Sequence, residues 1–231
     1  MNAVLALDTS TDYCSVAFVD NDVSRSVSES LPRAHNQHIL AMVDQVLGDS
    51  ALKGGVDVIA CGVGPGSFTG LRVAVGVAQG LAWSLDLPIW PFCSLRAQAL
   101  SDAARNESGY VLSLIDAQIG QVYGAWFQWR GDELHCISEP AIRVIEDFVA
   151  DSPVPLAEAC AVGDGVLAMS EQDRGAFAGL FPDLRPNVEA VAQMCRMEAN
   201  DTNLLSAAEL EPRYVQQDIG WKKLSEQGVQ R

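Results

Sequence analysis

The chain has 231 residues, which corresponds to one or two domains at about 150 residues each. Apolar residues make up 48% of it and charged residues 19%, so disorder, collagen and low-complexity scaffolds are excluded. Thirty acidic against fifteen basic residues give a net charge of −15, and this field repels a phosphate backbone. Composition therefore predicts a folded protein that does not bind nucleic acid unaided.

The cysteines occur singly, with no CxxC pair and no spacing typical of a zinc site or a disulfide framework. We interpret them as buried thiols in a reducing cytosol; they are Cys14, Cys61, Cys93, Cys136, Cys160 and Cys195. The N-terminal residues have no basic region of a signal peptide, and no stretch approaches the roughly 18 apolar residues of a membrane span. We therefore expect a cytoplasmic protein without a targeting or anchoring segment.

The first half of the chain predicts a mixed order of strands and helices. The apolar run AVLALD is typical of a strand covered on both faces, and the polar, alternating VSRSVSESL is typical of an edge strand. The expected elements are strands at 3–8, 14–20 and 23–31, a helix at 34–48, a strand at 56–64, a helix at 71–85, a strand at 88–93 and a helix at 94–105.

The same order recurs after a polar break near residues 106–109, which indicates an internal repeat of about half the chain. We expect strands at 110–117, 121–130 and 133–139, a helix near 145–150, a strand at 160–165, and helices at 188–199 and 204–211. The sequence thus predicts an α/β protein with an N-terminal lobe at 1–106 and a C-terminal lobe at 107–190. Residues 191–231 are expected to pack back on the first lobe, with Tyr214 and Trp221 anchoring the tail.

A glycine-rich loop, GVGPGSFTGLR at 62–72, lies between a predicted strand and a predicted helix. Glycine permits turns that aim several N–H groups at one point, as in an anion cradle. The loop lacks the Gly-Lys-Ser/Thr ending of a P-loop and the GxGxxG pattern of a dinucleotide fold. A tight strand-to-helix turn, capped by Ser67 or Thr69, is an equally good interpretation.

Two aspartates, Asp8 and Asp116, end the first predicted strand of each half. They could face each other across a cleft and hold a hydrated Mg²⁺ beside a nucleotide, as an ATP-dependent phosphotransferase or ATPase requires. Alternatively, each carboxylate caps the turn that follows it. The candidate nucleotide- or anion-facing residues are Asp8, Ser10, Gly64, Gly66, Ser67, Asp116, Gly163 and Gly165.

The predicted helix at 71–85 has a flank with almost no side chains, because Gly76 and Gly80 lie four residues apart with Ser84 beyond them. Such a surface lets a second helix approach closely, although the flank could instead pack on its own sheet. On the helix at 34–48, a stripe off the apolar face could contact a partner helix or remain solvated. The candidate partner-interface residues are His35, His38, Met42, Gln45, Arg72, Val73, Gly76, Val77 and Gly80.

The histidines do not form a convincing catalytic or metal site. His35 and His38 are three residues apart with no carboxylate or cysteine in helical register, which makes a weak metal site. His135 has no Gly-x-Ser-x-Gly elbow to accompany it, so a serine-hydrolase triad has little support. A metal-dependent peptidase would need ligands that the sequence does not offer.

The sequence resembles the TsaB family, also called YeaZ, whose members are bacterial partner proteins in threonylcarbamoyladenosine (t6A) synthesis on tRNA. The strings that carry the resemblance are LALDTSTDYCSVAFVD, GVGPGSFTGLRVAVGVAQGLAWSLDLPI, IDAQIGQVYGAWF, the GDG at 163–165 and PRYVQQDIGWKK. They span most of the chain. The resemblance implies the actin-like, Hsp70-like, sugar-kinase-like (ASKHA) fold, with two lobes of repeated βββαβα units.

The resemblance further implies a non-catalytic scaffold subunit that pairs with the protein TsaD through a four-helix packing of both N-terminal lobes. The ATPase TsaE joins them, and ATP or ADP with Mg²⁺ is held near the junction. When TsaD is absent we expect a homodimer, because the bare helix can pair with its own copy and two-fold association is the commonest oligomeric state. The complex modifies tRNAs that read ANN codons. This chain would touch tRNA only indirectly and would hold no tightly bound cofactor.

The catalytic relative TsaD binds its metal with an HxxxH pair shortly after the helix that follows its own Gly-Pro-Gly loop. Ser94 and Gln98 stand at the matching positions here, and neither is a strong ligand for a catalytic divalent metal. The resemblance therefore implies a fold that has lost the chemistry. The chain also has Gln118 and Gln121 where the family pattern has an arginine and a glutamate.

Overall fold

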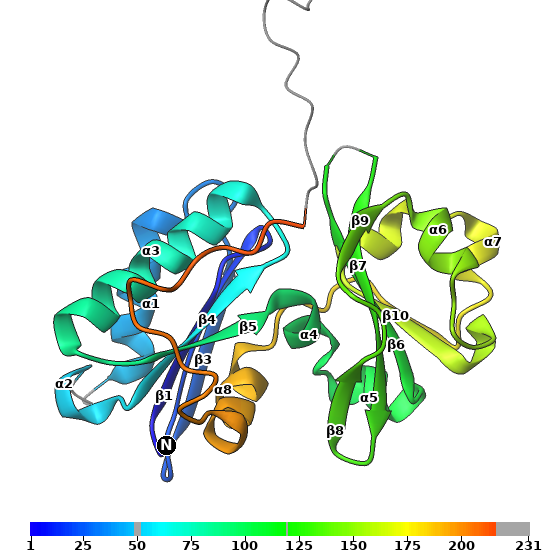
Figure 1. Cartoon of the computed structure of the whole chain (residues 1–231). Coiled ribbons are helices and arrows are strands. Elements are labelled where there is room, and N and C mark those ends of the chain that lie inside the picture. The colour runs from blue at the N-terminus through cyan, green and yellow to red at the C-terminus, as the bar shows by residue number, and fades with distance from the viewer. Residues whose placement is uncertain (49–51, 119, 216–231) are drawn as a thin grey trace, which may run out of the picture.

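The computed structural model describes residues 1–48, 52–118 and 120–215, and it contains two β-sheets side by side (Figure 1). The first sheet has the strand order β3-β2-β1-β4-β5. Strands β1, β4 and β5 are parallel, and β2 and β3 continue the sheet in antiparallel pairing. The bounds are β1 Val4–Asp8, β2 Tyr13–Val19, β3 Ser24–Ser30, β4 Val58–Gly64 and β5 Ile89–Cys93.

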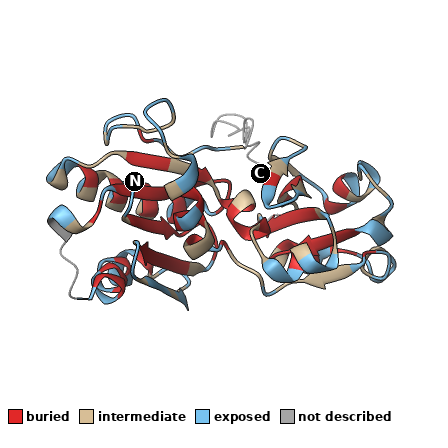
Figure 2. Cartoon of the chain, turned by 90° about the horizontal axis from the view of Figure 1, so that it is seen from below, coloured by how far each residue is buried: buried red, intermediate tan, exposed pale blue. Residues whose placement is uncertain are grey.

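Helices cover both faces of this sheet, which explains why β1 is apolar at every position but its last. Leu5 and Leu7 point toward the core under α1 (His35–Leu47) and α3 (Phe68–Leu85). Val4 and Ala6 point the other way, toward α8 (Val188–Glu198). Figure 2 shows the strands of both sheets largely in the buried colour. A short helix, α2 (Leu52–Gly55), precedes β4.

The second sheet repeats the plan of the first. Strands β6, β7 and β8 pair antiparallel, and β10 lies parallel to β6 as β4 lies parallel to β1. The repeated order confirms the expected α/β architecture. The bounds are β6 Tyr110–Asp116, β7 Val122–Arg130, β8 Glu133–Cys136, β9 Ala141–Arg143, β10 Ala159–Val162 and β11 Gly179–Phe181, with helices α5 Asp102–Glu107, α6 Ile145–Ala150 and α7 Glu171–Arg174 and 3₁₀ turns at Leu156–Glu158 and Asp164–Ala168.

Several predicted elements differ from the structure in their bounds. The helix expected at 94–105 is two helices, α4 (Ser94–Ala99) and α5, because the chain turns at Leu100 and Ser101. The strand expected at 160–165 ends at Val162, since Gly163 adopts a φ of 92° and turns the chain away. Helix α3 begins three residues earlier than expected, where the Ser67 hydroxyl accepts from the Gly70 N–H.

The prediction of a helix at 204–211 is wrong. Leu205 forms a β-bridge with Ile89 on the edge strand β5, so pairing with the sheet replaces local helical bonds. Further on, Leu210 is buried in the core of the first lobe and its carbonyl accepts from the Gln79 amide. Residues 216–231 lie outside the described residues, and Trp221 with them. No helix in the described part of the chain is long and apolar enough to cross a membrane.

Candidate partner interface and interlobe groove

The bare flank of α3 is open. Gly76 and Gly80 are exposed, and a Cβ atom built on either would meet no other group within 4 Å. The neighbouring line of Ala74, Ala78 and Ala82 is buried against the sheet. The two interpretations of the small residues thus apply to different sides of the helix: the alanines pack inward, and the glycines face outward.

An exposed tryptophan extends this flank. Trp83 is 78% exposed, and it follows Gly76 and Gly80 at helical spacing, with Val73 and Val77 half-buried alongside. We call the stripe formed by Val73, Gly76, Val77, Gly80 and Trp83 the glycine flank. Trp83 was not predicted, although its spacing of three residues from Gly80 was the signal that could have identified it.

The prediction of an exposed stripe on α1 is partly wrong. His35 and Met42 are only 7% and 3% exposed, and Met42 belongs to the core between the helices and the sheet. Both lie in register with Ile39 and Val46, so the buried face of α1 is wider than the apolar residues alone indicate. His38 and Gln45 are exposed as expected. Leu40, which is 58% exposed, adds an apolar side chain to the outer surface of α1.

Arg72 is engaged by the C-terminal segment rather than directed freely into solvent. Its guanidinium carbon lies 3.6 Å from the centroid of the Phe68 ring, and its Nε donates to the Tyr214 hydroxyl at 3.1 Å. The Phe68 and Tyr214 rings themselves lie 5.3 Å apart. Tyr214 thus anchors the described end of the chain on the first turn of α3, next to the glycine flank.

Asp8 does not face a cleft. It is 1% exposed, its Oδ1 accepts from the Ser10 N–H at 2.8 Å and the Ser10 hydroxyl at 2.6 Å, and its Oδ2 accepts from the Ser94 hydroxyl at 2.7 Å. Burial raises the pKa of this carboxyl above its ordinary value. The expected pairing of Asp8 with Asp116 around Mg²⁺ is therefore wrong, because Asp8 caps its own turn inside the protein.

Asp116 also caps a turn, but it is exposed. Its Oδ1 accepts from the Gln118 N–H at 2.8 Å, and its own N–H donates to Asp164 at 2.9 Å. Burial raises the pKa of Asp164, and the charges of Asp116 and Asp12 raise it further. Asp164 was not predicted as a site residue, because it comes beside Asp116 only when β10 pairs with β6, and these strands are far apart in the sequence.

An interlobe groove of about 280 Å³ brings together half of the predicted anion-facing residues. Ser10, Gly66 and Ser67 line it from the first lobe, and Asp116 lines it from the second. The other predicted glycines do not line it, because their backbones pack against neighbouring groups: Gly64 against Leu71 and the Arg213 carbonyl, Gly163 against Gln98, and Gly165 against Leu114.

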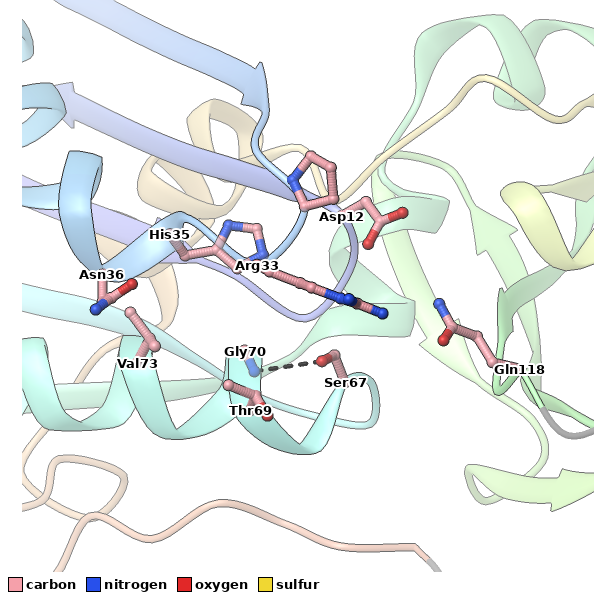
Figure 3. A pocket seen from close by; sticks show the side chains of 10 residues that line it. Asp12, Arg33, His35, Asn36, Ser67, Thr69, Gly70, Val73 and Gln118 are labelled. Carbon is pink, nitrogen blue, oxygen red and sulfur yellow. Dashed lines mark hydrogen bonds between the residues drawn. The ribbon is translucent and has the colours of Figure 1, made fainter.

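A larger hollow of about 700 Å³ adjoins the first turns of α1 and α3 (Figure 3). Neither first turn contains an acidic residue of its own, so the positive ends of both helix dipoles lie at this hollow, which the carboxylate of Asp12 also lines. In Figure 3 the Arg33 side chain extends from the first lobe toward Gln118 of the second. His35 also lines the hollow; its Nδ1 finds no hydrogen-bond partner in the described structure, and burial lowers its pKa.

The donor set of these two hollows does not form a metal centre. Within the described ranges, no three His, Cys, Asp or Glu side chains lie close enough together to hold an ion. Asp12 and Asp116 nevertheless offer carboxylate oxygens from the two lobes. Since Mg²⁺ keeps several waters and takes one or two protein carboxylates, these residues fit a hydrated Mg²⁺ that arrives on a phosphate group.

Comparison with known proteins gives concordant matches. A family model described as "TsaD: tRNA N6-adenosine threonylcarbamoyltransferase" matches residues 27–201. Two relatives named tRNA threonylcarbamoyladenosine biosynthesis protein TsaB come from Haemophilus influenzae and Escherichia coli K12. Each is 35% identical over 96% of this chain, which corresponds to 96% and 97% of the respective relative.

Solved structures agree with these matches. YeaZ from Pseudomonas aeruginosa superposes with a TM-score of 0.78 at 32% identity, and the match covers 93% of this chain and all of that one. A second structure, described as an uncharacterized protein with similarity to peptidase YeaZ from Pseudomonas aeruginosa, gives a TM-score of 0.80 at 32% identity over 94% of this chain.

Proposed function

Because the chain belongs to the TsaB (YeaZ) family and acts in tRNA threonylcarbamoyladenosine biosynthesis, we propose that it serves there as the non-catalytic subunit that binds and activates TsaD. Family membership confirms the resemblance seen in the sequence, and the two repeated sheets are those of the actin-like, Hsp70-like, sugar-kinase-like fold.

The observation that carries this proposal is the open glycine flank. At Gly76 and Gly80 nothing lies between the α3 backbone and solvent, so a helix of TsaD can approach more closely than side chains normally permit. Trp83 supplies a large apolar anchor at the end of the flank, and aromatic anchors carry much of the energy of protein interfaces. Without TsaD, the same self-complementary surface would pair two copies of this chain.

The absence of catalysis by this chain is supported by the bonding of three side chains. Ser94 and Gln98, which replace the histidines of TsaD, are buried and donate to protein acceptors. Asp8, which the phosphotransferase alternative needs in the groove, lies outside it. The proposal assigns the chemistry to TsaD and, given the net charge of −15, the main contact with tRNA as well.

We place the nucleotide of the complex in the two hollows between the lobes. Arg33 and the first turns of α1 and α3 attract phosphate, and Asp12 and Asp116 repel it unless a hydrated Mg²⁺ accompanies it. We therefore expect ATP or ADP to enter as its magnesium complex, and TsaE to join the assembly when the nucleotide binds.

The test is to mix the protein with TsaD, with and without TsaE and ATP, and to measure complex size, stoichiometry and threonylcarbamoyl transfer to tRNA. We expect a complex with TsaD that Gly76→Gln disrupts. The matched control Ala103→Gln adds the same side chain at an exposed position of α5 and should leave the complex intact. If Gly76→Gln binds TsaD as well as the unmodified chain does, the proposal is wrong.

Purified alone, the protein should not hydrolyse ATP. Turnover that disappears in Asp8→Asn would instead support the phosphotransferase alternative.

A further inference from the structure

Helix α4 lies between the two lobes and is buried on nearly every side. Ala97 belongs to the core that the first sheet forms with α8. Leu95 and Ala99 belong to the core of the second sheet. A helix of six residues is thus shared between two hydrophobic cores. Within the described residues the chain passes between the lobes twice, through α4 itself and through the segment before α8, and there the Asn187 N–H donates to the Ala97 carbonyl at 3.0 Å.

The N-terminal end of α4 is hydrogen-bonded to the first sheet through Ser94. The parallel register of β1 and β4 ends at the pair Leu7–Cys61, and Asp8 is the next residue of β1. The Ser94 hydroxyl donates to Asp8 Oδ2 at 2.7 Å, and neither residue is more than 1% exposed. A neutral donor to a fully buried carboxylate replaces part of the hydration which that group has lost.

Near its C-terminal end, α4 is hydrogen-bonded through Gln98 to the second sheet, where the equivalent pair of parallel strands ends. The parallel register of β6 and β10 ends at the pair Ser113–Val162. The Gln98 amide nitrogen lies 3.0 Å from the Leu114 carbonyl and 3.2 Å from the Val162 carbonyl, and so joins both strands where they separate. It also lies 3.0 Å from the Ser113 hydroxyl.

Packing alone does not account for a glutamine at position 98. Gln98 is 1% exposed, and its Oε1 is buried without a hydrogen-bond partner in the described structure. An unpaired buried acceptor destabilises the folded state, and a methionine of similar length would avoid that cost. Gly163 leaves the space that the amide needs, because a Cβ there would lie 2.0 Å from the Gln98 nitrogen. The N–H donors of the amide therefore explain why this position holds a glutamine.

We propose that α4 is an interlobe pin, in which Ser94 and Gln98 are positioning residues that fix the orientation of one sheet relative to the other. Since Ser94 and Gln98 are four residues apart, they lie on the same side of the helix and reach the carboxyl ends of both parallel strand pairs. The pin holds the lobes, and with them the walls of the interlobe groove, in one arrangement. This inference does not depend on the binding of TsaD.

The test measures the distance between the lobes in the full-length protein. Non-canonical residues that accept spin labels replace Asp44 on α1 and Glu171 on α7, both exposed, because the exposed native Cys136 rules out labelling through cysteine. Double electron–electron resonance is then recorded for the unmodified background, Ser94→Ala and Gln98→Met. Gln128→Met is the control, since the Gln128 amide donates to Tyr110 within the second lobe only.

We expect one narrow distance for the background and for Gln128→Met, and a broadened or shifted distribution for Gln98→Met, with a smaller change for Ser94→Ala. If Gln98→Met folds and keeps the narrow distance, the pin does not exist. Should Gln98→Met fail to fold, Ser94→Ala decides: a change that Gln128→Met lacks supports the pin, and an unchanged distribution overturns it.

Discussion

Replacing Gly76 by glutamine should raise the stability of the isolated chain and lower its affinity for TsaD. The position is helical, exposed and free of neighbours within 4 Å of a Cβ atom. Glycine in a helix interior is less favourable than a good helix former by about 0.5–1 kcal/mol. The monomer should therefore gain about that much free energy of unfolding, which raises Tm by about 1–4 °C for a chain of this size.

The same side chain would project into the surface that a partner helix approaches. Overpacking a close interface costs about 1–3 kcal/mol, which corresponds to a loss of about 5- to 150-fold in affinity. Titration calorimetry with TsaD measures the affinity. Urea unfolding, at concentrations where the chain is monomeric, measures the stability. A destabilised Gly76→Gln monomer would refute the open flank, and an unchanged affinity would refute its role as an interface.

Three further substitutions test separate parts of the structure. Trp83→Ser should change monomer stability by no more than about 0.5 kcal/mol but weaken TsaD binding by about 2 kcal/mol, as calorimetry can show; equal affinity would exclude Trp83 as an anchor. Leu210→Ala should cost about 2–5 kcal/mol in urea unfolding and speed hydrogen exchange at the Arg213 amide, and a negligible cost would contradict the docking of this segment. Because the pKa of Asp8 is raised in the folded state, its contribution to stability is lost as pH rises through that folded value. Asp8→Asn should therefore gain stability relative to the unmodified chain as pH rises above 3.8, and parallel pH profiles in urea unfolding would contradict this.

The elements of the fold that sequence predicted well are those with a strong local pattern. The run AVLALD is apolar because both faces of β1 are covered, and the helical spacing on 71–85 reflects one buried side of α3. The segment 204–211 has the same local character, yet Leu205 pairs with Ile89 across the sheet edge. Pairing with a distant strand overrides helix propensity, and no local pattern reveals it.

In the candidate site too, local patterns were predicted and contacts between distant segments were not. The glycine flank could be predicted because spacing along one helix decides which residues share a side. The groove could not, since Asp164 reaches it only through the folding of the second sheet. For Asp8 the sequence left two alternatives, a cleft and a capped turn. The structure shows the capped turn, which Ser10 forms locally, whereas the bond from Ser94 depends on the position of α4.

Under the proposed function, this chain acts through its glycine flank and leaves the chemistry to TsaD. The most direct measurement is threonylcarbamoyl transfer to tRNA by TsaD and TsaE supplemented with the unmodified chain, with Gly76→Gln/Gly80→Gln, or with Asp8→Asn. We predict transfer with the unmodified chain and with Asp8→Asn, and none above the level without added chain for the double variant. Full transfer with the double variant, or its loss in a folded Asp8→Asn that still binds TsaD, would contradict the claim.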